Sequence, residues 1–165
     1  MDNSIEKLIA FDMDETLGDF FQFSLIINFL ENTYKNKISQ KLFNNLLDNF
    51  PEFIRPNMID ILTVIKKEKC KNKKKIKVII FTNNQGPIEW SQSIKNYFNY
   101  KLKYDLFDDV LGGYKFKNKI IDGRRTSNEK RYNDLKNIYK LNDKSKICFI
   151  DDLYHPEMIH ININY

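Results

Sequence analysis

The chain has 165 residues, of which 42% are apolar. This length suits one domain with a buried core, and this composition excludes a largely disordered chain. The formal net charge of +5 raises the question of an acidic partner. No apolar run approaches the roughly 20 residues that span a bilayer, and the first residues lack a signal-peptide pattern. The 2 cysteines, Cys70 and Cys148, form neither a disulfide framework nor a zinc spacing. We therefore expect an intracellular, cytoplasmic protein with no membrane segment.

Short apolar runs predict the strands. They cover residues 8–11, 77–81 and 147–150, and such runs are typical of central parallel strands that are covered on both faces. A weaker strand is expected at residues 110–111, before a Gly-Gly turn. The tail, residues 158–165, is expected to add an edge strand to the same sheet.

Amphipathic helices are predicted between the first two strands. Residues 24–34 and 39–50 are spaced as a helical hairpin. Residues 58–65 place apolar side chains at positions i, i+3, i+4 and i+7, and Pro56 is expected at the first helical position.

Two further helices are predicted between the later strands. The first covers residues 88–104, after a Gly-Pro pair, and the second covers residues 129–139. Thr126 and Glu129 are spaced as a capping box at the start of the second of these helices.

The alternation of strands and helices predicts an α/β fold with a doubly wound, Rossmann-like, mainly parallel sheet. A single domain over residues 1–165 is expected, in which residues 20–52 form a small helical cap insertion after the first strand. In such sheets the site lies at the carboxyl ends of the strands. The three clearest strands end at Asp12, Thr82 and Asp151, so we expect these three residues to lie close together.

A lysine-rich stretch between the second helical region and the second strand carries much of the positive charge. It fits a solvated helix end, where cations complement the helix dipole, which is the interpretation we favour. A patch for nucleic acid or another polyanion is the alternative. The lysines are Lys66, Lys67, Lys69, Lys71, Lys73, Lys74 and Lys75.

Two aspartates, Asp12 and Asp14, follow the first strand two positions apart. Their carboxylates would repel each other unless a cation lies between them or one of them is protonated. Mg²⁺ prefers such oxygen ligands, and a carboxylate is also the nucleophile of enzymes that form an aspartyl phosphate. Alone, the pair also fits a solvated acidic turn or a helix N-cap.

Polar residues follow the other two strands in the same way. Thr82 and Asn83 offer a hydroxyl and a backbone amide near a helix N-terminus, which is a natural phosphate cradle. Asp151 and Asp152 would complete a metal site. Each motif alone fits an ordinary loop, whereas three of them at neighbouring strand ends indicate one crevice.

In this order the motifs resemble those of the haloacid dehalogenase-like (HAD) superfamily of phosphohydrolases. Residues 12–16, Asp-Met-Asp-Glu-Thr, are similar to its first motif, Thr82 after an apolar strand to its second, and Asp151-Asp152 to its fourth. The resemblance covers residues 7–152. It implies a Mg²⁺-dependent phosphatase that acts on a phosphorylated substrate.

The resemblance implies a role for each acidic residue. Asp12 would attack phosphorus and form a phosphoryl-aspartate. Asp14 would protonate the leaving oxygen and then activate the water that hydrolyses this intermediate. Mg²⁺ would be held by Asp12, the Asp14 backbone carbonyl, and one or both of Asp151 and Asp152.

Thr82, the Asn83 amide and Lys130 would hold the phosphoryl oxygens. The third motif of the superfamily is a Lys or Arg upstream of the final acidic pair, and Lys130 is assigned to it because it lies at the start of the helix that feeds the last strand. Three other basic residues compete for this role: Arg125, Arg131 and Lys136.

The class of substrate is left open. Arg55-Pro56 and the paired aspartates faintly resemble phosphatases that act on the RNA polymerase tail, which would imply a phosphoprotein. A small phosphometabolite or nucleotide is equally compatible, and a nucleic-acid end is favoured only by the positive charge. A catalytically idle HAD-like binding module is the alternative from a different class.

Two groups of residues beside the motifs have open or minor roles. Phe20, Phe21 and Phe23 fit either a mobile flap over the site or core packing of the insertion, and packing is the interpretation we favour. His155 and His160 have no metal-ligand spacing and are expected to be structural.

Overall fold

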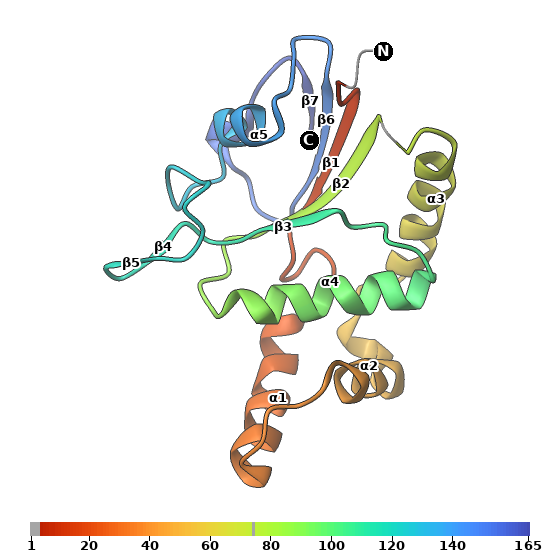
Figure 1. Cartoon of the computed structure of the whole chain (residues 1–165), viewed down its shortest axis with the longest axis vertical. Helices are drawn as coiled ribbons and strands as arrows, with labels where there is room; N and C mark the ends of the chain where they lie inside the picture. Colours follow the sequence, from red (N-terminus) through yellow and green to blue (C-terminus); the bar gives the residue numbers. More distant parts are fainter. Residues whose placement is uncertain (1–3, 74) are drawn as a thin grey trace.

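The computed structural model describes residues 4–73 and 75–165. Over these residues the chain forms a Rossmann-like α/β arrangement around a five-stranded sheet with strand order β3-β2-β1-β6-β7 (Figure 1). Every strand pair in this sheet is parallel. The strands are β1 (Lys7–Phe11), β2 (Ile76–Phe81), β3 (Asp109–Leu111), β6 (Lys146–Ile150) and β7 (Ile163–Asn164). The predicted central strands, the weaker third strand and the edge strand of the tail are confirmed.

Helices cover both faces of the sheet. Apolar side chains of β2 alternate between the faces, as the pleat of a strand requires. Val78 and Ile80 belong to a core that includes residues of α3 and α4, whereas Ile79 and Phe81 pack with residues of α5. The helices are α1 (Phe20–Tyr34), α2 (Gln40–Asn49), α3 (Met58–Lys71), α4 (Ile88–Leu102) and α5 (Tyr132–Tyr139).

The central strands end at the same edge of the sheet. β1 lies between β2 and β6, and Phe11 is paired with Ile80 on one side and with Ile150 on the other. The backbone N–H of Asp12 donates to the carbonyl of Ile150 at 2.8 Å. The polar residues that follow these strands therefore meet above one edge.

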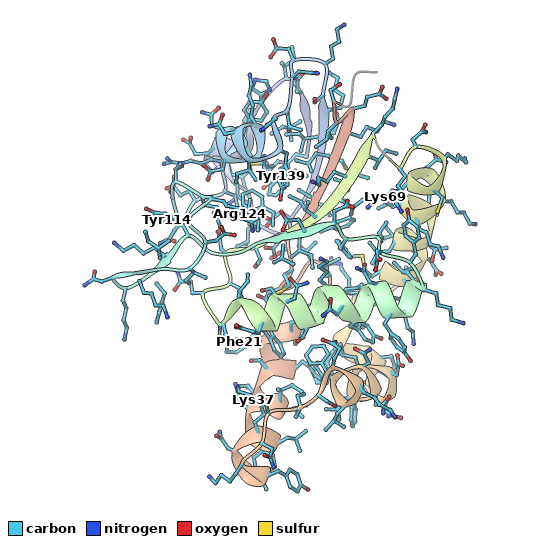
Figure 2. The ribbon with its side chains drawn as sticks, in the orientation of Figure 1. Phe21, Lys37, Lys69, Tyr114, Arg124 and Tyr139 are labelled. Carbon is cyan, nitrogen blue, oxygen red and sulfur yellow. The ribbon has the colours of Figure 1, made fainter. Side chains whose placement is uncertain are left out.

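The helical segment after β1 consists of α1 and α2, which extend from the body on the far side of α4 (Figure 1). α2 packs against α4, and Phe20 of α1 contacts Phe98 of α4. α1 begins at Phe20, four residues earlier than predicted, because the Asp19 side chain caps it by accepting a hydrogen bond from the N–H of Gln22. Phe20 and Phe23 are buried and Phe21 is exposed (Figure 2). Core packing of Phe20 and Phe23 is thus confirmed.

The predicted starts of two further helices, α3 and α5, are also wrong. Pro56 is not helical, because Asn57 adopts a left-handed conformation (φ 63°) and α3 begins at Met58. α5 begins at Tyr132 and not at residue 129, because Arg131 has extended backbone angles. α4 also ends at Leu102, two residues before its predicted end.

The capping box predicted before α5 is not formed. The Thr126 hydroxyl donates instead to the Asp134 carboxylate at 2.7 Å. The segment before α5 is held in a non-helical path because the buried Arg125 guanidinium donates to the carbonyls of Asn128 and Glu129. The same guanidinium also donates to the carbonyls of Thr82 and Gly112, which are distant in the chain. A side chain anchored by tertiary contacts therefore overrides the local helix signal.

The lysine-rich stretch forms the end of α3 and the turn to β2. Lys69 is buried between α3 and the sheet (Figure 2), where its ammonium donates to the Asp108 carboxylate and to the Leu106 carbonyl, both at 2.6 Å. Lys71 is paired with the nearby Glu68 at 2.7 Å. Most lysines of this stretch are exposed, as predicted for a solvated helix end, but Lys69 is a buried structural cation. Lys74 lies outside the described residues.

Candidate active site

Asp12 is the central residue of the candidate site. It follows β1 directly and is only 8% exposed. The Lys130 ammonium lies 2.5 Å from Asp12 Oδ1 and 2.5 Å from Asp151 Oδ2. One cation thus joins the residues that follow two neighbouring strands, β1 and β6.

Lys130 reaches these carboxylates from an unexpected position. It was expected at the start of a helix, but it lies in the irregular segment before α5. Its side chain is buried between the rings of Phe81 and Phe149, with the ammonium 5.6 and 5.7 Å from their centroids. Aromatic faces attract a cation by their quadrupole, so the strands that flank the site also hold its lysine.

The competing basic residues lie elsewhere. Arg131 is paired with Glu129 at 3.3 Å, and Lys136 with Asp143 at 3.4 Å. Arg125 is buried but points to backbone carbonyls. Of the four candidates for the third motif, only Lys130 contacts Asp12 and Asp151.

Asp152 is held on the other side of the site by Thr16. The Thr16 hydroxyl donates to Asp152 Oδ1 at 3.0 Å and accepts from the Asp152 backbone N–H at 3.1 Å. One carboxylate oxygen from each of Asp12, Asp151 and Asp152 lies within 4.8 Å of the other two. Three carboxylates this close favour a divalent cation such as Mg²⁺, which prefers carboxylate oxygens.

Asp14 lies beside this cluster and outside the group of three. Its Oδ2 accepts a hydrogen bond from the Asn84 side-chain amide at 3.0 Å, and its buried Oδ1 has no hydrogen-bond partner among the described residues. Burial is the main cause that raises the pKa of Asp14, and the Asn84 hydrogen bond opposes it. A carboxyl that holds its proton more readily than usual is suited to donate it.

The pKa of Asp12 is also raised, from the ordinary 3.8 to about 6. Burial is the largest cause, since removal from water disfavours the charged form, and the Lys130 ammonium acts against it. Near neutral pH Asp12 is ionised. A bound cation would favour the ionised form further.

The loop after β2 supplies hydrogen-bond donors on a third side of the candidate site. Thr82 is buried, its backbone N–H donates to the Leu111 carbonyl at 3.0 Å, and its hydroxyl accepts from the backbone N–H of Asn84 at 3.0 Å. Asn83 lies between them and is exposed, and its backbone N–H donates no hydrogen bond within the described part of the chain. That amide is free to meet an anion, as amides near a helix N-terminus do.

Arg125 holds the support of the site together. Its guanidinium donates to the carbonyls of Thr82 at 3.0 Å, Gly112 at 2.9 Å and Glu129 at 2.9 Å, and it lies 4.8 Å from the centroid of the Phe81 ring. These carbonyls belong to the ends of β2 and β3 and to the segment that carries Lys130. Burial lowers the pKa of Arg125 to about 10, so it remains charged near neutral pH.

Sequence reasoning missed two contributors to this arrangement, Asn84 and Arg125. Asn84, next to the recognised Thr82-Asn83 pair, positions Asp14. Arg125 was considered only as a rival of Lys130. His155 was expected to be structural, and its Nε2 lies 3.1 Å from Asp151 Oδ2, without hydrogen-bond geometry. Only Asn84 carried a local signal, because it directly follows two recognised residues.

A cavity of about 760 Å³ lies between α1, α2 and the amino end of α4. Phe43 and Trp90 give it apolar walls, and Asn84 lines its edge. Asn84 also bonds Asp14, so one residue joins the wall of the cavity to the candidate site. Its volume is in the range of small-molecule sites.

No protein-family model matches the sequence, and a search of curated proteins finds no match. None of the helices in the described part of the chain is long and apolar enough to cross a membrane.

Proposed function

We propose that the protein is a Mg²⁺-dependent phosphohydrolase of the haloacid dehalogenase type that forms a phosphoryl-aspartate on Asp12. The observation that carries the proposal is the contact of the Lys130 ammonium with both Asp12 and Asp151, beside the partly satisfied carboxyl of Asp14. These side chains supply a nucleophile, a fixed cation and a proton donor.

In the first step, a carboxylate oxygen of Asp12 attacks the phosphorus of a phosphate monoester. The bond from phosphorus to the leaving oxygen breaks, and Asp14 gives its proton to that oxygen. Lys130, the Thr82 hydroxyl and the Asn83 amide stabilise the charge on the remaining phosphoryl oxygens.

In the second step, the ionised Asp14 takes a proton from a water molecule that attacks the phosphorus. The bond from phosphorus to the Asp12 oxygen breaks, which releases phosphate and restores Asp12. The raised pKa of Asp14 supports both proton transfers.

Asp12, Asp151 and Asp152 are the side chains that would hold Mg²⁺, with the Asp14 backbone carbonyl as a further ligand. Their oxygen-only donor set fits this ion, and the buried Asp14 Oδ1, which has no hydrogen-bond partner among the described residues, is an acceptor beside it. When bound, the ion supplies positive charge that offsets the repulsion between the carboxylates and the phosphate.

The decisive experiment is turnover of p-nitrophenyl phosphate by the wild-type chain and by Asp12→Asn. We expect turnover that EDTA abolishes in the wild type, and none in Asp12→Asn, with the circular dichroism of the two proteins unchanged. Asp60→Asn, at an exposed position on α3, is the matched control and should retain full turnover. Absence of turnover in the wild type would support the alternative of an idle binding module.

A further inference from the structure

A short β-hairpin interrupts the chain between β3 and α5. It consists of β4 (Lys115–Phe116) and β5 (Lys119–Ile120), which pair in an antiparallel fashion and project from the body (Figure 1). Phe116 is 47% exposed and Ile120 is 54% exposed. The hairpin contributes to neither core of the domain, so its side chains are available to a partner.

The hairpin carries three lysines and no acidic residue. Lys115, Lys117 and Lys119 lie within it, and residues 112–121 contain no Asp or Glu. Among the described residues, none of these three lysines forms an ion pair. The Lys117 ammonium instead lies 5.4 Å from the centroid of the exposed Phe116 ring. The hairpin thus combines free cations with an aromatic face.

The base of the hairpin is attached to the candidate active site. The backbone N–H of Gly113 donates to the Asn84 carbonyl at 3.2 Å. A Cβ at Gly113 would lie 2.7 Å from that carbonyl oxygen, so this close approach requires glycine. Tyr114 follows at the base of the hairpin (Figure 2). Because Asn84 also bonds Asp14, a chain that leaves the site has the hairpin beside it.

The lysine-rich stretch at the end of α3 lies too far from the candidate active site to contact a substrate that is bound there. The carbonyl of Lys75 accepts from the backbone N–H groups of Glu6 and Lys7, at the start of β1. This stretch therefore lies at the amino ends of the strands, whereas Asp12 and Thr82 follow their carboxyl ends. Lys69, moreover, is already neutralised by Asp108.

We propose that the hairpin binds the backbone of a single-stranded nucleic acid whose terminal phosphate enters the site at Asp12; this rests on the proposed phosphatase function. Three unpaired lysines supply contacts to successive phosphates. The exposed Phe116 ring supplies a surface on which a base stacks, an interaction that single-stranded chains allow and that sequence-tolerant binders use. An acidic phosphopeptide would use the lysines but would leave the ring without a stacking partner.

The test is fluorescence anisotropy of a labelled oligothymidylate of about 12 nucleotides that carries a 3′-phosphate, measured in EDTA to prevent turnover. The hairpin variant is Lys115→Ala/Lys117→Ala/Lys119→Ala. The matched control, Lys67→Ala/Lys71→Ala/Lys73→Ala, removes the same charge from exposed positions at the opposite edge of the sheet. Phe116→Ala tests stacking separately.

We expect the hairpin variant to lose at least about tenfold in affinity at low salt, and the slope of log affinity against log salt to become shallower by about 2. Phe116→Ala should lose about tenfold with the slope unchanged, and the control should stay within about twofold of the wild type. Equal losses in the hairpin and control variants would overturn the proposal, because they would show an effect of net charge alone. Binding of an acidic phosphopeptide that depends equally on Phe116 would also overturn it.

This experiment is independent of catalysis. If the wild type binds the oligonucleotide through the hairpin but does not hydrolyse p-nitrophenyl phosphate, the phosphatase proposal fails and the binding surface stands. If it hydrolyses the aryl phosphate and the hairpin variant binds the oligonucleotide as the wild type does, the binding surface fails and the phosphatase stands.

Discussion

The Nζ of Lys130 lies 2.5 Å from Oδ1 of Asp12, although the two residues are 118 positions apart in the chain. Both side chains are buried, and a buried charge is stable only when it is paired. The ion pair therefore couples the stability of the fold to the chemistry proposed for the site.

Lys130→Met tests this coupling, because methionine retains the apolar stem that packs between Phe81 and Phe149. We expect turnover to fall by at least about 100-fold. The free energy of unfolding at pH 8 should fall by roughly 3–5 kcal/mol, because Asp12 and Asp151 lose their buried partner. The loss should be smaller at pH 5, where the pKa of Asp12, already about 6, leaves it largely protonated.

Urea unfolding at the two pH values measures this difference. The exposed Lys144→Met is the control and should change the free energy of unfolding by less than about 0.5 kcal/mol. An equal loss at both pH values for Lys130→Met would contradict the ionic explanation.

The pKa of Asp12 predicts how the metal-free protein responds to pH. In the folded chain it is about 6, above the ordinary 3.8, so the folded state binds the proton more tightly than the unfolded state. The contribution of Asp12 to stability is complete below pH 3.8 and is lost as the pH rises through about 6. The loss is about 3 kcal/mol at most, and Asp12→Asn should remove this part of the pH dependence.

Mg²⁺ should reverse this trend, because it binds the ionised carboxylates. We expect Mg²⁺ to raise the thermal midpoint more at pH 8 than at pH 5, and to have little effect on Asp12→Asn at either pH. Differential scanning fluorimetry with and without EDTA measures the shift. A shift of the same size in wild type and Asp12→Asn would place the ion elsewhere.

Asn84→Ala tests the residue that positions Asp14. Without the Asn84 amide, the pKa of Asp14 should rise further, since that hydrogen bond favours the ionised form. We expect a reduction in kcat of about tenfold and a displacement of the Asp14 limb of the pH–rate profile to higher pH. Asn137→Ala, an exposed asparagine on α5, should leave the profile unchanged. A lower kcat with an unmoved profile would indicate a packing role for Asn84 only.

Arg125→Met removes the guanidinium that joins the ends of β2 and β3 to the segment of Lys130. The carbonyls of Thr82 and Gly112 would each lose a donor while these residues remain buried, and the Glu129 carbonyl would lose a donor at a more exposed position. We expect the free energy of unfolding to fall by at least about 3 kcal/mol, with turnover reduced because Lys130 is less well placed. Arg131→Ala, whose pair with Glu129 is at the surface, should cost less than about 1 kcal/mol. Similar losses for the two variants in urea unfolding would refute this role of Arg125.

The central strands were predictable because their signal is local. A short unbroken apolar run between polar residues is typical of a strand that is buried on both faces of a sheet, so β1, β2 and β6 were recognised directly. The boundary of α5 was not, because the helix signal of Thr126 and Glu129 competes with contacts to Arg125 that come from distant parts of the chain. The β4–β5 hairpin was missed because its strands are too short to show a periodic pattern.

By itself, the sequence determined that polar residues follow the apolar strands in the order Asp12, Thr82, Asp151, because the order of elements is written along the chain. Only the tertiary structure decided which basic residue joins Asp12 and Asp151, because the four candidates, Arg125, Lys130, Arg131 and Lys136, all lie in the same stretch of chain before β6. The choice depends on which side chain the rings of Phe81 and Phe149 enclose, and that is settled when the strands pack. The carboxylates of the site can therefore be identified from the sequence, whereas the lysine that joins them can be identified only from the packing of the strands.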